Sequence, residues 1–328
     1  MVESALGASA APRSEGVSLS KLAFGVTVGT VLVVLFGAVV RITGSGAGCG
    51  QHWPTCHGEV AHLPQSVETW IELTHRTTSG VDFISVLVLL LLAKKRLPGR
   101  HPALLAAAAA MVFMVVEAGI GARLVLLNLV GSNSSIDRAV VMPAHLITTS
   151  LLLGSLAAAT YFSSERRVSL RDLPAARAAV TSAWRWLLSA GVLLLLVSMT
   201  GAVTALGDTV YPVQGATALE RLQNDQAVGA HFLGRVRVVH PLLALLGVGV
   251  LWVAAGRVRE VPGDARFERW GGALYAGGGL ALLIGVVNIW LKAPGYLQVI
   301  HLLMACVLWI AVVVLGAMLW DARRAKEG

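Results

Sequence analysis

Residues 297–320 read LQVIHLLMACVLWIAVVVLGAMLW, an uncharged run that carries one histidine near its start. A helix needs about 20 such residues to cross a hydrocarbon layer about 30 Å thick. Seven further apolar runs of similar length occur in the chain, at residues 20–40, 73–93, 103–124, 142–162, 184–206, 238–256 and 270–291. The sequence therefore predicts an all-α integral membrane protein with eight transmembrane helices.

The composition favours the same class. The chain has 328 residues, of which 56% are hydrophobic and only 13% are charged, whereas soluble proteins carry about 25% charged residues. Eight spans and their short connections leave no room for a large soluble domain. Residues 1–19 are small and polar, and we expect them to form a disordered tail rather than a cleavable signal.

Basic residues follow alternate spans. Most of the 26 lysines and arginines fall in the two tails or in the connections at 94–100, 166–185 and 257–269. Cytoplasmic loops are enriched in these residues, so both termini are predicted to lie in the cytoplasm of a multi-pass cell-membrane protein. The outward loops are then 41–72, 123–142, 206–237 and 292–297. The net charge of +8 reflects this orientation, and no nucleic-acid partner is expected.

Four histidines lie near the outer ends of alternate spans: His75, His145, His240 and His301. An ionisable side chain in a membrane is costly unless it binds a ligand or faces a cavity. Imidazole is an axial ligand of haem iron, and helix bundles hold metals between histidines on facing helices. The four residues therefore predict two ligand pairs for two haems near the outer face. A single such histidine would more often be a hydrogen-bonded packing residue.

The spacing of these residues indicates an internal repeat. The tripeptide Gly-Ala-Val at 37–39 recurs at 201–203, an offset of 164 residues, and His75 and His240 differ by 165. We therefore predict two four-helix bundles, each with a histidine on its second and fourth helices. Their predicted bounds are residues 20–165 and 184–320, joined by a cytoplasmic linker at 166–183 and followed by a tail at 321–328.

The first outer loop, predicted at 43–71, contains Cys49 and Cys56 in the run GCGQHWPTC. An oxidising compartment favours a disulfide between them, and the pattern is not the Cys-x-x-Cys-His motif of covalent haem attachment. Cys306 is expected to be an inert packing thiol. The nearby histidines are expected to be solvated: His52, His57 and His62.

Glu72 lies three residues before His75 and four before Arg76, so in a helix all three share one face. Pairing with Arg76 is the simpler interpretation of the acid. The sharper one is a carboxylate at a haem edge that handles protons or stabilises a cation. Arg237, not an acid, stands three residues before His240, which suggests one catalytic centre and one electron-relay centre.

Other charged residues have less specific roles. Four arginines near the outer face could pair with haem propionates or anchor at lipid headgroups: Arg76, Arg123, Arg235 and Arg237. Asp82 and Glu117 lie inside predicted spans. Asp82 is expected either to hydrogen-bond within its bundle or to relay protons, and the partner of Glu117 is open.

At these residues the chain resembles haem A synthases. The resemblance covers about residues 22–320 and rests on two four-span halves, the Glu72-x-x-His75-Arg76 motif, the three further histidines and the cysteine pair. The run GAVVRITGSG at 37–46 is also similar to this family.

The resemblance implies a reaction and a role for each half. In the family, the enzyme oxidises the C8 methyl of haem O to a formyl group, which gives haem A for terminal oxidases. By this resemblance, Glu72 is catalytic, His75 and His145 bind the substrate haem O, and His240 and His301 are the iron ligands of a haem b cofactor. The cysteines look like a redox-active or stabilising pair.

The resemblance also sets expectations for partners. These are haem O, haem O synthase, an electron acceptor and membrane lipid, while a homo-oligomer is left open. A dihaem electron-transfer protein, similar to the cytochrome b561 class of quinol or ferric reductases, would explain the four histidines. It would not explain Glu72 in one half only, nor the cysteine loop. A two-repeat transporter would bind no haem and would lack a Soret band.

Overall fold

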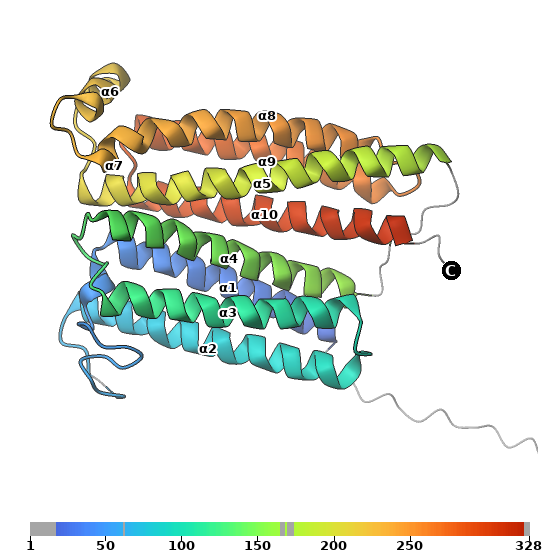
Figure 1. Cartoon of the computed structure of the whole chain (residues 1–328), viewed down its shortest axis with the longest axis horizontal. Helices are drawn as coiled ribbons and strands as arrows, with labels where there is room; N and C mark the ends of the chain where they lie inside the picture. Colours follow the sequence, from blue (N-terminus) through green and yellow to red (C-terminus); the bar gives the residue numbers. More distant parts are fainter. Residues whose placement is uncertain (1–17, 62, 165–167, 169–173, 325–328) are drawn as a thin grey trace, which may run out of the picture.

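The computed structural model describes residues 18–61, 63–164, 168 and 174–324, and these residues form a bundle of helices (Figure 1). Eight of the described helices are long and apolar enough to cross a membrane. Their bounds are α1 Leu19–Ile42, α2 Val67–Arg96, α3 Pro102–Leu126, α4 Ile136–Phe162, α5 Pro174–Val210, α8 Val239–Arg259, α9 Ala265–Trp290 and α10 Gly295–Arg324. The predicted class, an all-α membrane protein with eight spanning helices, is confirmed.

The second spanning helix starts earlier than its apolar run. Ser66 caps α2 by accepting a hydrogen bond from the Thr69 backbone N–H at 3.2 Å, which satisfies one of the free donors at the helix start. The helix therefore begins at Val67 rather than at residue 73. Glu72 consequently lies in the helix and not in the predicted outer loop 41–72.

Other boundaries also differ from the apolar runs. α5 begins at Pro174, inside the region 166–183 that was predicted to be a linker, and continues to Val210. α10 continues to Arg324, inside the predicted tail 321–328, and α1 already begins at Leu19. Most of the predicted N-terminal tail, residues 1–17, lies outside the described residues.

The predicted outer loop 206–237 contains two short helices, α6 (Ala218–Gln226) and α7 (Phe232–Arg235). A capping box starts α6: the Thr217 side chain accepts from the Glu220 N–H, and the Glu220 carboxylate accepts from Thr217. Backbone N–H groups of Ala216 and Thr217 lower the pKa of this carboxyl. Two short 3-10 helices, η1 (Ser45–Ala47) and η2 (Val236–Val238), complete the elements.

The eight long helices run nearly parallel and form two groups (Figure 1). In the first group, α1 contacts α2 and α4, and α3 contacts α2 and α4. In the second group, α8 contacts α5 and α9, and α10 contacts α5 and α9. α4 and α10 lie between the groups, because α4 contacts α5 and α10, and α10 also contacts α1.

A glycine allows the two groups to approach closely at α4 and α10. The Trp309 indole of α10 donates a hydrogen bond to the Ser150 carbonyl of α4 at 2.5 Å. A side chain on Gly154 would lie 3.1 Å from the Trp309 Nε1 atom. Small residues permit such close approaches between membrane helices. Here Gly154 leaves room for the Trp309 indole, whose N–H group finds a hydrogen-bond acceptor inside the membrane.

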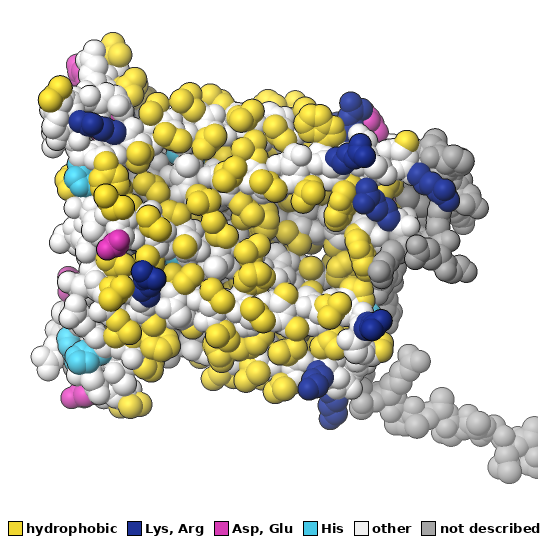
Figure 2. Space-filling view, viewed as in Figure 1, with side chains coloured by type: hydrophobic (Ala, Val, Ile, Leu, Met, Phe, Trp, Pro, Cys, Tyr) yellow, Lys and Arg dark blue, Asp and Glu magenta, His cyan; other side chains and the backbone are white. Residues whose placement is uncertain are grey.

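The distribution of side chains on the surface of the helix bundle is that of a protein embedded in a lipid bilayer. Hydrophobic side chains cover the middle of the bundle in Figure 2, and lysines and arginines gather at its right-hand end. α1 begins and α10 ends at that same end (Figure 1). Large apolar side chains such as Leu32 and Leu188 are exposed on the bundle, as a lipid-facing surface requires.

Candidate functional site

The four predicted histidines each pack on a glycine of the preceding spanning helix. A Cβ atom added to Gly201 of α5 would lie 3.0 Å from Cε1 of His240 on α8. The other three pairs are Gly37 with His75 at 3.1 Å, Gly285 with His301 at 3.3 Å, and Gly121 with His145 at 4.0 Å. At Gly37, Gly201 and Gly285 the absence of a side chain therefore makes room for an imidazole ring, whereas the distance at Gly121 is an ordinary van der Waals contact.

The structure brings His240 and His301 together in the second group of helices. Their ring centroids are 6.3 Å apart and the rings are nearly perpendicular. Metal–imidazole bonds are about 2 Å long, and a ring centre lies about 1 Å behind its nitrogen. Two rings that share one metal ion therefore have centres about 6 Å apart, and this pair fits that spacing.

One nitrogen of His240 is held by the backbone. Its Nδ1 atom lies 3.1 Å from the carbonyl oxygen of Val197 on α5. Because a carbonyl oxygen only accepts, Nδ1 carries the proton and Nε2 keeps its lone pair. Partners of this kind orient metal-binding histidines. Nδ1 of His301 is buried without a hydrogen-bond partner among the described residues.

Glu117 plays the corresponding part for His145 in the first group. Its Oε1 atom lies 3.1 Å from Nδ1 of His145, an ion-pair distance without hydrogen-bond geometry, and the hydroxyls of Thr148 and Thr149 donate to its carboxylate. A carboxylate behind the imidazole directs the other ring nitrogen outward as a ligand. The sequence left the partner of Glu117 open, and the structure identifies it.

Glu72 is buried, with 3% of its surface exposed. It forms the ion pair with Arg76 that the simpler interpretation predicts. Its second oxygen, Oε2, accepts a hydrogen bond of 2.7 Å from the backbone N–H of Cys49. The sequence did not predict this contact, because the two residues lie in different segments and the donor belongs to the backbone.

The cysteine loop folds over the start of α2. Cys49 and Cys56 are buried and joined by a disulfide. The Thr69 hydroxyl of α2 donates to the Gly48 carbonyl at 2.7 Å. A Cβ atom on Gly48 would lie 2.5 Å from the backbone of Glu68, so only glycine fits here. The loop therefore rests on the helix that carries Glu72.

Two of the four arginines predicted to bind propionates form ion pairs within the protein. Arg76 donates to the carbonyls of His52 and Thr55 as well as to Glu72. Arg237 forms ion pairs with Asp208 at 2.9 Å and Asp225 at 2.6 Å. Arg123 and Arg235 are the exposed members of the set, and their contact with propionates stays a prediction.

The remaining predicted residues lie apart from these centres. Asp82 is buried and accepts a hydrogen bond of 3.0 Å from the Thr30 hydroxyl, the first of its two predicted roles. Cys306 is a buried free thiol, as expected. His52 and His57 are exposed, and His62 lies outside the described residues. Among the described residues, no three His, Cys, Asp or Glu side chains converge on one metal position.

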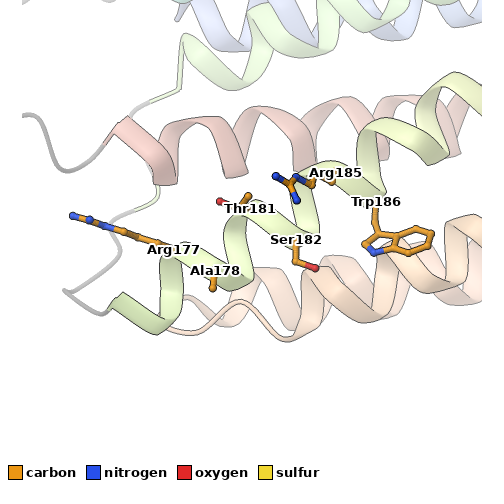
Figure 3. Close-up of a pocket in the computed structure, with 6 residues that line it drawn as sticks. All are labelled: Arg177, Ala178, Thr181, Ser182, Arg185 and Trp186. Atoms are coloured by element: carbon orange, nitrogen blue, oxygen red, sulfur yellow. The ribbon is translucent and has the colours of Figure 1, made fainter.

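A hollow of about 480 Å³ lies at the opposite end of the bundle from the histidines (Figure 3). Its lining residues all belong to the start of α5: Arg177, Ala178, Thr181, Ser182, Arg185 and Trp186. These side chains point in different directions and do not converge (Figure 3). The candidate site is therefore the pair of histidine centres with Glu72, and not this hollow.

The first prediction concerns the glycine under His240. In Gly201→Ala, the added methyl group would press on the imidazole, and overpacking costs about 1–3 kcal/mol. We expect the variant to fold but to have a lower thermal midpoint. Gly249→Ala is the matched control, because a Cβ there meets nothing within 4 Å. Equal thermal midpoints in the two variants would contradict the close packing.

The second prediction concerns the disulfide. Thiol labelling of denatured, unreduced protein should modify Cys306 only, and labelling after reduction should modify all three cysteines. A bridge closing so short a loop restrains the unfolded chain by about 2–3 kcal/mol, so Cys49→Ser should lower the thermal midpoint. Labelling of three thiols without reductant would contradict the bridge.

Comparison with known proteins identifies the family. Residues 20–313 match the family described as "Cytochrome oxidase assembly protein", COX15-CtaA. The chain is 45% identical over 318 residues to a protein of Thermus thermophilus named "Protoheme IX farnesyltransferase". That match takes 94% of this chain but only 50% of the relative, so the chain spans about half the length of that relative.

Shorter matches carry a different name. Over 108 residues, the chain is 40% identical to the "Heme A synthase" of Lysinibacillus sphaericus. This match covers 33% of this chain and 35% of that protein. Over 92 residues it is 44% identical to the "Heme A synthase" of Bacillus cereus, 28% of this chain and 30% of that protein. The chain therefore belongs to the COX15-CtaA family of cytochrome oxidase assembly proteins, which confirms the resemblance to haem A synthases.

Proposed function

We propose that this chain is a haem A synthase, which oxidises the C8 methyl group of haem O to a formyl group. The observation that carries the proposal is an asymmetry between two similar histidine centres. Each centre has histidines packed on glycines, but only the first has a buried carboxylate, Glu72, one helical turn before a histidine. A catalytic centre and a cofactor centre differ in this way.

His240 and His301 would hold haem b, and His75 and His145 would hold haem O. The spacing of the first two rings and the glycine-lined room at three of the four support this assignment. Bound haem supplies one-electron redox chemistry at its iron. Glu117 and the Val197 carbonyl orient two of the imidazoles, so their ligating nitrogens are fixed before a haem enters.

Glu72 would accept a proton as the methyl group is oxidised, or stabilise positive charge that develops there. Its carboxylate is held from two sides, by Arg76 and by the Cys49 N–H. Such preorganisation is the usual basis of electrostatic catalysis. With water as the source of the formyl oxygen, R–CH3 and H2O give R–CHO, four protons and four electrons, and an electron acceptor outside this chain must take the electrons. His240 and His301 would hold a haem that could supply electron transfer.

The name of the Thermus thermophilus relatives describes another modification, the transfer of a farnesyl group to protoheme IX. Because the chain matches half of those proteins, we assign that transfer to their other half. Their greater length supports a partnership between this chain and a farnesylating enzyme. The other proposed partners are an electron acceptor and membrane lipid. We also propose that the protein lies in the cell membrane with its haem sites near the outer face.

Co-expression with a source of haem O tests the proposal directly. Extracted haems are separated and weighed by mass spectrometry, and a haem with formyl in place of methyl is the expected product. A dihaem electron-transfer protein would instead give a b-type spectrum and no new haem. Conversion of protohaem to a farnesylated haem would show that the chain performs the relatives' named reaction.

The third prediction separates the two histidine pairs. His240→Met and His301→Met should lose the stable b-type haem, because each removes one of two axial ligands. Changes at His75 or His145 should keep that haem but abolish product. The measurements are the optical spectrum of the purified protein and the haem A content of membranes. An unchanged haem b spectrum in His240→Met would show that this ligand is wrongly assigned.

The fourth prediction concerns Glu72. Glu72→Gln keeps the size and one acceptor oxygen but cannot take up a proton, so turnover should fall about 10²-fold or more. Haem b content should stay near normal. The measurement is the ratio of haem A to haem O in membranes, normalised to enzyme abundance.

Arg76→Gln is the matched control for this change. If Glu72 serves only to pair with Arg76, the two variants should be equally stable and equally active. If Glu72 acts on the substrate, Glu72→Gln should be much the slower of the two. A normal haem ratio in Glu72→Gln would remove the residue from the mechanism.

A further inference from the structure

Arg41, at the end of α1, joins the two groups of helices. Its Nη1 atom donates to the Ala205 carbonyl at 2.7 Å and to the Thr209 hydroxyl at 2.6 Å, both on α5. Its Nη2 atom donates to Oε1 of Gln298 on α10 at 2.8 Å. One guanidinium from the first half therefore binds two helices of the second half.

Arg41 and its acceptor Gln298 each lie one helical turn from a residue of a histidine–glycine contact. Arg41 follows Gly37 by four residues, and Gly37 is the glycine beneath His75. Gln298 precedes His301 by three residues on α10. Residues three or four apart are neighbours on a helix surface, so the guanidinium and its acceptor connect the outer sides of the two centres.

The second half of the repeat has no arginine at the position that corresponds to Arg41. With the repeat offset of 164 residues, the counterpart of Arg41 is Ala205, whose own carbonyl accepts the bond. The repeat therefore places one cation between the halves and not two. Arg41 binds Thr209, the neighbour of Asp208 in the chain, and Arg237 pairs with both Asp208 and Asp225, so two arginines share two carboxylates in this region.

We propose that Arg41 is a positioning residue that fixes the two histidine centres relative to each other, and whose charge favours the reduced state of the haem at His240 and His301. The inference rests on the ligation proposed above. Reduction adds one electron to the iron, so a nearby positive charge stabilises the product. Partly buried charges are weakly screened, and such charges tune haem potentials.

Redox titration of the haem-loaded protein tests the inference. Arg41→Gln should lower the midpoint potential of the b-type haem, and Arg41→Lys, which keeps the charge, should restore most of it. Arg266→Gln is the control. Arg266 pairs with Asp264 at 2.6 Å at the start of α9, at the other end of the bundle from the histidines. Its loss should leave the potential unchanged.

A second variant keeps the test decisive if Arg41→Gln fails to accumulate. Gln298→Glu can accept the same hydrogen bond from Arg41, but it adds a negative charge one turn from His301. The potential should again fall while haem content is retained. Full haem b with unchanged potential in Arg41→Gln, or in Gln298→Glu, would overturn the inference and leave the ligation intact. A wild-type protein that binds no haem b would overturn both.

Discussion

The contact between an imidazole ring and a glycine on the preceding helix is the constraint on which this structure depends. A methyl group on Gly201 would stand 3.0 Å from the His240 ring, so the helix spacing and the ring position are set together. Membrane helices have no hydrophobic drive to associate, and close packing at small residues takes its place. The same contact therefore holds the bundle together and presents the ring.

Ring orientation is a separate requirement, and the two halves meet it differently. In the second half, a backbone carbonyl, that of Val197, holds Nδ1 of His240. In the first half, the carboxylate of Glu117 lies behind His145. A carboxylate makes the imidazole a stronger electron donor than a carbonyl does. A shared helix frame thus gives two histidine centres whose imidazoles have different partners.

The sequence was sufficient for the spans, because a run of about 20 apolar residues has few other interpretations. The repeated spacing also predicted that His240 and His301 lie close together, and their ring centroids are 6.3 Å apart; the ligand roles of the four histidines stay predictions. It failed for α6, which has no apolar run, although Thr217 and Glu220 form a capping box that is readable from spacing. The contacts of Glu117 with His145 and of Arg41 with α5 could not be predicted, since both depend on how separate helices are rotated.

The cysteine loop and Glu72 depend on each other. The Cys49 N–H is bonded to the carboxylate, and Arg76 ties the same carboxylate to the carbonyls of His52 and Thr55 in the loop. A buried carboxylate without such donors would be costly, and the loop without the carboxylate would leave a backbone donor unpaired. The disulfide closes the segment that carries these donors. The position of the acid is therefore set by the oxidised form of the loop as well as by the helix on which the acid lies.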